Sequence, residues 1–293
     1  MDCAHSIIGL KNKWTVTMNK STALIVLTCD NYSDLWPMFI EFSEKYWPDC
    51  PYDKYFITNN KEIPESSFNS IKIGKDDSWS DGLLRAIVEL KPKYDYLLIT
   101  LEDSPLIDYV DQNKLNVITD AFLSAKGNFL SLFTQHNMGK PTRKFNEYFG
   151  IIDKGSLYRP TCVYSLWKIS VLEDLLIREE NAWDFERYGS VRSDKYDDFF
   201  MVYNNFFIMS NTVIKGKWLR SEYKKIKKLG YKPNIIDREL MSMKEEFFLK
   251  TYTLIFIILN KYVPIPWKIR RRVIFKLKGY KYVETIANEF KGQ

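Results

Sequence analysis

Short apolar runs alternate with longer segments of mixed polarity along the first third of the chain. The runs at 23–29, 55–58 and 71–73 are rich in β-branched and aromatic residues, and each stops at polar or glycine residues, which is typical of strands. Residues 34–46 and 82–90 carry apolar side chains at helical spacing. Strands that alternate with helices predict an α/β fold with a doubly wound, mostly parallel, Rossmann-like sheet.

The strand predicted at 94–101 ends abruptly in two neighbouring carboxylates, Glu102 and Asp103. Such an apolar run is typical of a buried strand, and open α/β sheets bind ligands at the carboxyl ends of their strands. Mg²⁺ and Mn²⁺ take oxygen ligands and commonly bridge to nucleotide phosphates. We therefore predict that Glu102 and Asp103 hold a divalent metal. The alternative is a pair of solvated acids at a strand end.

The pattern becomes less regular further along the chain. Strands are predicted at 129–133 and 161–167 and a helix at 169–180, whereas residues 137–155 read as an irregular excursion. The aromatic run 199–203 follows a group of acids and is predicted as a buried helix that these acids cap. The alternative is that one of these acids touches a substrate.

Length and composition set the domain organisation and exclude some classes of site. The 293 residues, of which 45% are hydrophobic, suit one large domain at 1–235 with a helical extension at 236–293. Four widely spaced cysteines and two histidines, with no CxxC pair, argue against a structural zinc site and against disulfides. We see no secretory signal and no apolar run near the roughly 20 residues that cross a bilayer, so we expect a cytoplasmic protein.

The formal net charge of +6 is concentrated near the C-terminus. The basic residues there are Lys224, Lys225, Lys227, Lys228, Arg270, Arg271, Arg272, Lys276, Lys278 and Lys281. Between the two clusters lie Phe247, Phe248, Tyr252, Leu254, Ile255, Phe256, Ile257, Ile258 and Trp267. This interleaving predicts a helical surface on an anionic leaflet, at the inner face of the cell membrane. A packing or dimerisation helix is an alternative, no nucleic-acid partner is expected, and the oligomeric state stays open.

Three features occur in order along the chain: a strand with a polar loop at 23–33, the segment KDDSWSD at 75–81, and the strand that ends in Glu102 and Asp103. Together they resemble bacterial GT-A-type glycosyltransferases of surface-polysaccharide synthesis, such as capsule or O-antigen synthesis. Later segments are similar to the acceptor-side and closing segments of that family, at 165–168, 180–186 and 213–218. The resemblance covers roughly 22–230.

The resemblance implies a GT-A-like fold and the transfer of a sugar from a nucleotide-diphosphate sugar to a hydroxyl of a glycan acceptor, which the basic C-terminal surface suggests is lipid-linked. Mn²⁺ or Mg²⁺ on Asp103 would neutralise the departing diphosphate. The family is usually described by an Asp-X-Asp motif, and here only Asp103 matches its final Asp. Glu102 is then a second ligand, a water-mediated ligand or a contact to the ribose. Some relatives of this architecture use basic side chains in place of a metal.

The loops that follow the strands are predicted to bind the nucleotide sugar. The predicted residues are Thr28, Asp30, Asn31, Asn59, Asp76, Asp77, Trp79, Asp81, Arg85, Glu102, Lys215 and Lys217. The first four lie where base and ribose are read, and Lys215, Lys217 and Arg85 can approach the diphosphate. A solvated basic turn is the alternative for these cations, and helix capping by Ser80 or Asp81 is the alternative for part of the loop.

On the acceptor side, Glu186 is predicted as the general base of an inverting displacement, with Asp184 and Glu180 as alternatives. Trp167 and Trp183 are predicted to form a platform for a sugar ring, because apolar sugar faces stack on aromatic rings. The alternative is that both tryptophans anchor the core.

A noncatalytic nucleotide- or polysaccharide-binding subunit of a cell-envelope assembly complex is the alternative function. The two functions differ in whether Asp103 and Glu186 converge on one cleft. A nucleotidyltransferase would need a glycine-rich or lysine-containing phosphate loop beside the first strand, and residues 28–33 contain neither. Donor, acceptor and stereochemical outcome depend on pocket geometry that no spacing reveals.

Overall fold

The computed structural model describes residues 21–134 and 141–262, together with residues 269 and 273. The strands of its main sheet are β1 (Thr22–Leu27), β2 (Asp53–Thr58), β3 (Asn69–Lys72), β4 (Tyr96–Leu101), β5 (Phe129–Ser131), β6 (Arg143–Lys144), β7 (Phe149–Ile151), β8 (Ser165–Lys168) and β9 (Phe199–Val202). They lie in the order β3-β2-β1-β4-β8-β5-β9-β7-β6. A separate hairpin pairs β10 (Val213–Ile214) with β11 (Lys217–Trp218).

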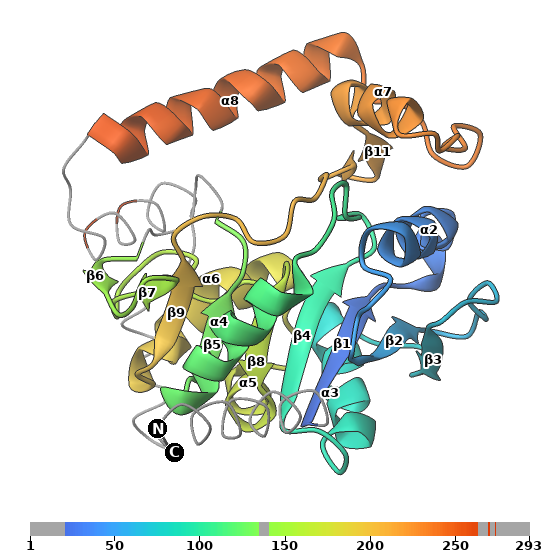
Figure 1. Ribbon diagram of the computed structural model, residues 1–293. Coiled ribbons are helices and arrows are strands. Elements are labelled where there is room, and N and C mark those ends of the chain that lie inside the picture. Colours follow the sequence, from blue (N-terminus) through green and yellow to red (C-terminus); the bar gives the residue numbers. More distant parts are fainter. Residues whose placement is uncertain (1–20, 135–140, 263–268, 270–272, 274–293) are drawn as a thin grey trace, which may run out of the picture.

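The helices complete a layered α/β arrangement (Figure 1). They are α2 (Trp36–Tyr46), α3 (Trp79–Leu90), α4 (Gln112–Ser124), α5 (Ile169–Leu175), α6 (Ala182–Arg192), α7 (Arg220–Lys228) and α8 (Met243–Tyr262), with the 3-10 turns η1 (Asp30–Tyr32) and η2 (Ser193–Lys195). Strands β1 to β4 run parallel to one another. Strand β8 runs antiparallel between β4 and β5, and β7 runs antiparallel to β9. The predicted α/β, mostly parallel, Rossmann-like fold is confirmed.

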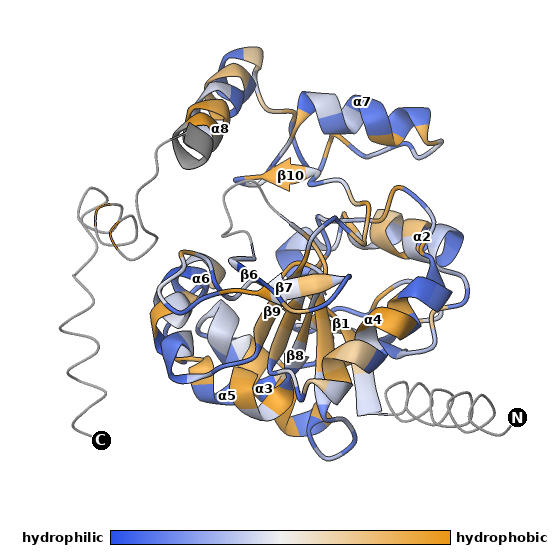
Figure 2. Ribbon diagram, turned by 60° about the vertical axis from the view of Figure 1, so that its left-hand side comes forward, coloured by the Kyte–Doolittle hydropathy of each residue, from blue (hydrophilic) through white to orange (hydrophobic). Residues whose placement is uncertain are grey.

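Strand β1 shows how the sequence fits a sheet that is covered on both faces. All six of its side chains are buried. Leu24 and Val26 pack in an apolar cluster with α2 and α4, whereas Ala23 and Ile25 pack in a second cluster with α3 and α5. Successive side chains of a strand point to opposite faces, so this strand needs an uninterrupted apolar run. Figure 2 shows α2 and α4 on one side of the sheet and α3, α5 and α6 on the other.

Residues 199–202 form strand β9, so the helix predicted for 199–203 is wrong. All four side chains are buried, and the strand pairs with β5 on one side and with β7 on the other. Aromatic and β-branched residues fit such a position well. Two of the acids before the strand hold neighbouring segments, because Asp194 accepts a hydrogen bond from the Gly155 amide (2.7 Å) and Asp197 pairs with Lys154 (2.8 Å).

Two other predicted elements are shorter than expected. The strand predicted at 161–167 begins only at Ser165, and Tyr164 just before it has a left-handed φ of 43°. The helix predicted at 169–180 ends at Leu175, where Leu176 is extended, and a turn closed by a hydrogen bond from the Glu180 amide to the Ile177 carbonyl (3.0 Å) then leads to α6. Sheet pairing and the turn into α6 set these ends, and neither is visible in the local apolar pattern.

Helices α7 and α8 lie beyond the edge of the sheet at which β1 and β4 end (Figure 1). The segment between them returns to the hairpin, since the Trp218 amide donates to the Glu239 carbonyl (2.9 Å) and the Met241 amide to the Trp218 carbonyl (2.8 Å). Chain on both sides of the predicted boundary at residue 235 therefore packs with β11. No helix in the described part of the chain is long and apolar enough to cross a membrane. The rest of the predicted extension, 263–293 apart from residues 269 and 273, lies outside the described residues.

Candidate functional site

Polar side chains gather at the edge of the sheet where β1, β2 and β4 end. These strands are parallel, so the residues that follow them, Thr28, Asn59 and Glu102, lie at the same edge. Strand β8 runs antiparallel to β4 and pairs Ser165 with Ile99, so β8 starts at this edge and the segment before it lies there. Ligands of open α/β sheets bind at such an edge.

Asp30 and Asn59 lock the first two loops of this edge together. The Asp30 carboxylate accepts hydrogen bonds from the backbone amides of Asn59 (3.2 Å), Asn60 (3.0 Å) and Lys61 (3.2 Å). In return the Asn59 side-chain oxygen accepts from the Asp30 amide (3.1 Å). The Asn59 amide group donates to Asp76 (2.9 Å) and to the Gly74 carbonyl (3.0 Å). The structure thus brings together three of the predicted donor-binding residues, and it uses Asp30 mainly to shape the loop after β2.

Thr28 joins the first loop to the acidic pair. Its hydroxyl accepts a hydrogen bond from the Trp36 indole (2.8 Å) and also bonds the Glu102 carboxyl, which favours the charged form of Glu102. Cys29 lies within electrostatic reach of both Glu102 and Asp76, and burial is the main reason that the pKa of its thiol is raised. The acids of the β4 end and of the loop after β3 therefore border one region.

Glu102 and Asp103 form a crowded pair of acids. Glu102 is buried, and desolvation together with the neighbouring charge of Asp103 raises its pKa well above the ordinary value. Burial also raises the pKa of Asp103 to about 6, although a hydrogen bond from the Ser104 hydroxyl (3.1 Å) opposes the shift. Two adjacent carboxylates of this kind ionise together only when positive charge is close. The backbone beneath them is fixed, because Thr212 donates to the Asp103 carbonyl from its amide (2.9 Å) and its hydroxyl (2.8 Å).

Arg238 supplies positive charge at this point, and the sequence patterns did not reveal it. Its guanidinium binds both oxygens of Asp34 at 2.8 Å and stacks on the Tyr32 ring, 4.3 Å from the ring centroid. It also donates to the carbonyls of Gly216 (3.0 Å) and Asn31 (3.2 Å). Its charge lowers the pKa of both Glu102 and Asp103 against the effect of burial. Of its five N–H groups, one on Nη1 has no partner among the described residues.

The two lysines predicted to approach a diphosphate are placed differently. Lys217 forms ion pairs with Glu239 (2.9 Å) and Glu245 (3.2 Å), so its charge is already matched by acids of the chain. Lys215 is exposed and begins the two-residue turn between β10 and β11, where it and Gly216 have φ values of 52° and 76°. Positive φ at both turn residues is the geometry of a tight hairpin. Arg238 therefore replaces Lys217 as the cation next to the acids.

Asp81 and Arg85 shape the loop before α3. The Asp81 side chain is fully buried and pairs with Arg85 (2.6 Å) and with Arg178. Arg85 also donates to the carbonyls of Ile73 (3.2 Å) and Lys75 (2.8 Å). Ser78 caps the helix by accepting from the Asp81 amide (3.0 Å), so the cap predicted at Ser80 or Asp81 lies at Ser78 instead. The predicted ligand contact of Asp81 is corrected to a role in positioning the loop, because its buried carboxylate accepts from the Asp77 amide (3.2 Å). The Arg85 side chain is 38% exposed, and its approach to a diphosphate stays a prediction.

Glu186 reaches the same edge from α6. It accepts a hydrogen bond from the Thr161 hydroxyl (3.3 Å) and another from the Cys162 amide, and both donors belong to the segment before β8. Burial raises the pKa of Glu186 to about 7 despite these bonds. Trp79 at the start of α3 packs on Phe185 with ring centroids 5.6 Å apart, which ties α6 to the loop after β3. The segment before β8 thus links the two predicted acids indirectly, because it binds Glu186 through Thr161 and reaches the residue after Asp103 through a hydrogen bond from the Tyr164 hydroxyl to the Ser104 carbonyl (3.1 Å).

The two alternatives to Glu186 have structural roles. Asp184 caps α6 reciprocally, since its amide donates to the Asn181 side chain (3.0 Å) and its carboxylate accepts from the same side chain (2.6 Å). Glu180 forms a buried bidentate pair with Arg192 at 2.7 and 2.5 Å. Asp184 also pairs with Arg187 (3.3 Å) and its side chain is 30% exposed, so its catalytic role stays a prediction.

The two predicted tryptophan platforms differ in burial. Trp167 is fully buried against Phe129 (centroid distance 4.5 Å) and donates to the Thr161 carbonyl (3.1 Å). It has no face left for a sugar, so its predicted role is corrected to that of a core residue that supports Thr161. Trp183 is 65% exposed in the first turn of α6, three residues before Glu186.

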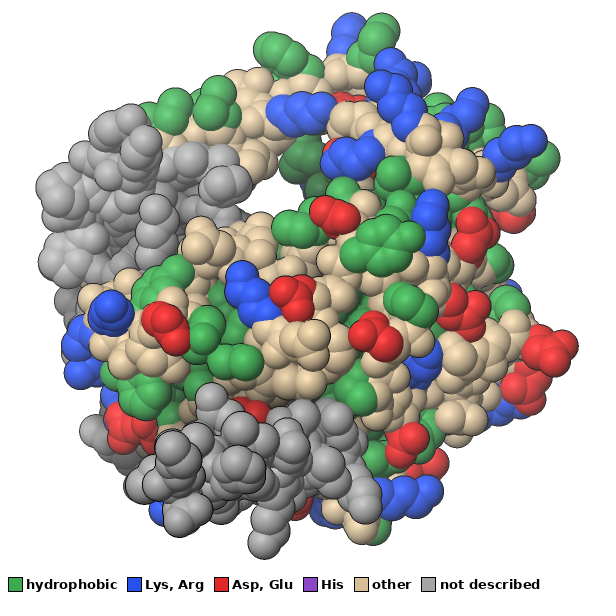
Figure 3. All heavy atoms as spheres, in the orientation of Figure 1, with side chains coloured by type: hydrophobic (Ala, Val, Ile, Leu, Met, Phe, Trp, Pro, Cys, Tyr) green, Lys and Arg blue, Asp and Glu red, His purple; other side chains and the backbone are tan. Residues whose placement is uncertain are grey.

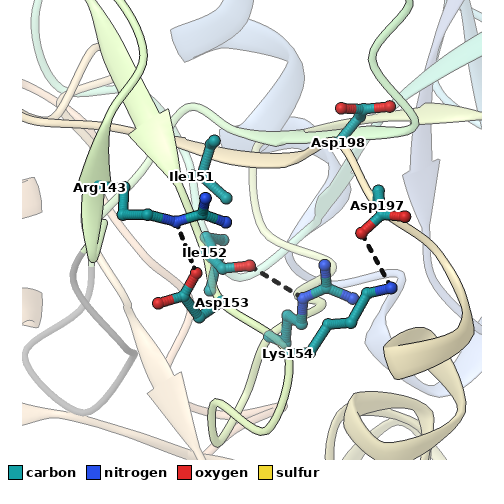
Figure 4. A pocket seen from close by; sticks show the side chains of 8 residues that line it. Arg143, Ile151, Ile152, Asp153, Lys154, Asp197 and Asp198 are labelled. Carbon is teal, nitrogen blue, oxygen red and sulfur yellow. Dashed lines mark hydrogen bonds and ion pairs between the residues drawn. The ribbon is translucent and has the colours of Figure 1, made fainter.

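A pocket of about 470 Å³ lies elsewhere, at the start of β9 (Figure 4). Strand β9 runs in the same direction as β4, so its start is at the opposite edge of the sheet from Glu102 and Asp103. Two of its cations are matched by acids, Arg143 with Asp153 (3.0 Å) and Lys154 with Asp197 (2.8 Å), and Arg159 donates to the carbonyls of Ile152 (3.1 Å) and Tyr196 (3.1 Å). This pocket is separate from the acidic pair.

Across the residues that the structure describes, no group of three or more His, Cys, Asp or Glu side chains is arranged to hold a metal ion. Glu102 and Asp103 alone can offer carboxylates at the end of β4. One or two carboxylates are what proteins commonly give Mg²⁺ when substrate phosphates supply other ligands. The raised pKa of both acids means that burial disfavours their joint ionisation, which nearby positive charge would restore.

No family model matches the chain, and no curated protein matches it in sequence. The solved structures that resemble it include two at 10% sequence identity. TarS from S. aureus matches over 79% of this chain and 42% of its own, with a TM-score of 0.45. The UTP-bound UGPase from Acinetobacter baumannii matches over 80% of this chain and 98% of its own, with a TM-score of 0.48. The chain spans less than half of TarS, and no residue role is carried over from either structure.

Proposed function

We propose that this protein is a glycosyltransferase that moves a sugar from a nucleotide-diphosphate sugar to a hydroxyl of a glycan acceptor. The observation that supports the proposal is a crowded acidic pair, Glu102 and Asp103, at the edge of the sheet where the segment before β8 also lies, together with the Glu186 carboxylate that binds Thr161 in that segment. The acidic pair suits a metal that binds the diphosphate half of the donor, and Glu186 suits proton removal from the acceptor. A carboxylate whose pKa burial raises to about 7 suits a general base at neutral pH, which a purely binding subunit does not require.

The donor would lie across the ends of β1, β2 and β4. Asp103, with Glu102, would hold Mn²⁺ or Mg²⁺, and a bound cation of this kind would neutralise the diphosphate as it leaves the sugar. Arg238 has one N–H without a partner among the described residues and supports the same task from the other side. Asp76 has one oxygen engaged by Asn59, so its other oxygen is suited to accept from the nucleoside.

The acceptor hydroxyl would face Glu186. In an inverting displacement the hydroxyl oxygen forms the new bond to the sugar, the bond to the diphosphate breaks with its electrons, and the proton passes to the Glu186 carboxylate. A pKa of about 7 matches this role at neutral pH. The exposed Trp183 ring nearby in sequence is suited to stack on an acceptor sugar. A lipid-linked glycan of capsule or O-antigen synthesis is the acceptor class that we propose.

Calorimetric titration of the full chain with UDP, GDP and CMP, each with and without Mn²⁺, tests the donor site. We expect one nucleotide to bind in a metal-dependent manner, and Asp103→Asn to weaken that binding by at least about tenfold. Asp49→Asn is the matched control, because Asp49 is exposed and lies after α2, away from the β4 end. If the folded protein binds none of the nucleotides, or if both variants behave alike, the proposal fails.

A further inference from the structure

Helix α8 carries an apolar surface that the described part of the chain leaves uncovered. Its exposed apolar side chains are Met243, Phe247, Phe248, Tyr252, Leu254, Ile255 and Ile258. At about 100° per residue, these seven positions fall within about half of the helix circumference. Figure 3 shows an opening between α8 and the main body, and Figure 1 shows the helix standing away from the sheet.

Within the described residues, the polar contacts that attach α8 to the rest of the chain lie in its first turns. The Glu246 carboxylate accepts from the amides of Arg220 (2.9 Å) and Ser221 (3.3 Å) and so caps α7. These bonds and the Lys250 pair lower the pKa of Glu246 to about 2 although burial opposes the shift. Glu245 pairs with Lys217 (3.2 Å). A helix fixed at one end by polar contacts presents the rest of its apolar side to something outside the chain segment described.

The basic residues of helix α7 indicate that the partner of this surface is negatively charged. Its exposed lysines are Lys224, Lys225, Lys227 and Lys228. Blue and green side chains share the upper rim of the molecule in Figure 3, over α7 and α8. The sequence adds basic residues of the same sign after α8, since residues 263–281 contain no Asp or Glu. A second copy of this face would bring like charges together, whereas a layer of anionic headgroups would bring opposite charges.

We propose that α7 and the exposed side of α8 form a docking surface for an anionic lipid bilayer, with the apolar side chains of α8 in the headgroup boundary and the α7 lysines on the headgroups. Aromatic residues such as Phe248 and Tyr252 are favoured at that depth. The surface lies beyond the edge at which β1 and β4 end, so docking would turn that edge toward the membrane (Figure 1). The inference does not depend on the proposed transferase activity.

Co-sedimentation of the full chain with vesicles tests the surface. We expect binding to vesicles that contain phosphatidylglycerol, little binding to phosphatidylcholine alone, and loss of binding as salt rises and the Debye length falls from about 8 Å to about 3 Å. Phe248→Asp and Ile255→Asp are each expected to lower the partition coefficient at least about tenfold. Thr253→Asp is the matched control, because it places the same charge on the opposite side of α8 and should leave binding unchanged.

The lysines are tested in pairs. Lys224→Gln with Lys228→Gln should lower the partition coefficient by about fivefold for each charge, and Lys93→Gln with Lys126→Gln, at the far end of the sheet, should not change it. Equal binding to both kinds of vesicle, or equal effects of variants and controls, overturns the proposal. A dimer in solution that Phe248→Asp separates, without vesicle binding, assigns the surface to a second copy and also overturns it. Nucleotide titration of the same variants keeps this outcome apart from a failure of the donor site.

Discussion

Replacing Arg238 with Gln is expected to destabilise the protein strongly, because the guanidinium ties its own segment to residues 31–34 and to the hairpin. It bridges the Asp34 carboxylate, the Asn31 carbonyl in the first loop and the Gly216 carbonyl in the hairpin. The side chains of Arg238 and Asp34 are only 7% and 11% exposed. The variant leaves the Asp34 charge nearly buried without its partner, and the pKa of Glu102 rises further because Arg238 no longer lowers it.

Breaking a buried ion pair from one side costs about 3–5 kcal/mol. We expect about 3 kcal/mol here, because Asp34 lies near a loop that water can reach. With a urea m-value of about 3 kcal/mol/M, the unfolding midpoint falls by about 1 M. Arg143→Gln is the control, since Arg143 and Asp153 are 66% and 43% exposed, and its cost is expected to stay below about 1 kcal/mol.

A double-mutant cycle with Asp34→Asn separates the pair from other effects. In the Arg238→Gln background, Asp34→Asn should cost at least about 1 kcal/mol less than it does alone, because the unpaired charge has been removed. Urea unfolding followed by circular dichroism measures all four proteins. Additive effects, or an Arg143→Gln loss as large as that of Arg238→Gln, would refute the reasoning.

Three further predictions concern the acceptor side and the loop before α3. The wild-type rate should fall about tenfold per pH unit below pH 7, because the Glu186 carboxyl is then protonated and cannot accept a proton. The Glu186→Gln variant should not show this acidic decrease, and its kcat should be lower by a factor of about 10²–10⁴. Trp183→Ala should raise the acceptor KM and leave urea stability nearly unchanged, whereas Trp167→Ala should cost about 3–5 kcal/mol of stability; similar stability losses for both would contradict the assigned burial. Asp81→Asn should lower the thermal midpoint by several degrees, since it leaves Arg85 and Arg178 without their shared carboxylate, and an unchanged midpoint would argue against that role.

The fold and the acidic pair were predictable because the relevant signals are local. An apolar run covered on both faces and followed by two acids needs only about ten consecutive residues to be recognised, and Glu102 and Asp103 occupy the expected edge. Glu186 was reached through the resemblance of segment 180–186, whereas the helix α6 that carries it was not predicted. An apolar run and the residues that end it are consecutive in the chain, so they can be recognised without knowledge of the fold.

Arg238 and Lys217 illustrate what local patterns miss. Arg238 reaches Asp34 across 204 positions, and its own neighbours form no periodic pattern. The sequence around Lys217 contains no acid that would pair with it, and its partners Glu239 and Glu245 lie more than 20 residues later in the chain. Trp167 and Trp183 both lie next to helix starts, and only the insertion of β8 between β4 and β5 determines that the first is buried.

The candidate donor site and the lipid-docking surface share one continuous segment of the chain. Thr212 holds the carbonyl of Asp103, the hairpin that follows presents Gly216 to Arg238, and Lys217 next to it pairs with Glu245 in α8. A displacement of α8 would therefore move a hairpin that is linked to the acidic pair in two ways. Thr212 binds the Asp103 carbonyl, and Gly216 binds Arg238, which lowers the pKa of both acids. If vesicles bind through α8, nucleotide affinity measured with and without them should differ, and the difference should disappear in the Arg238→Gln variant, because the hairpin is then released from the first loop.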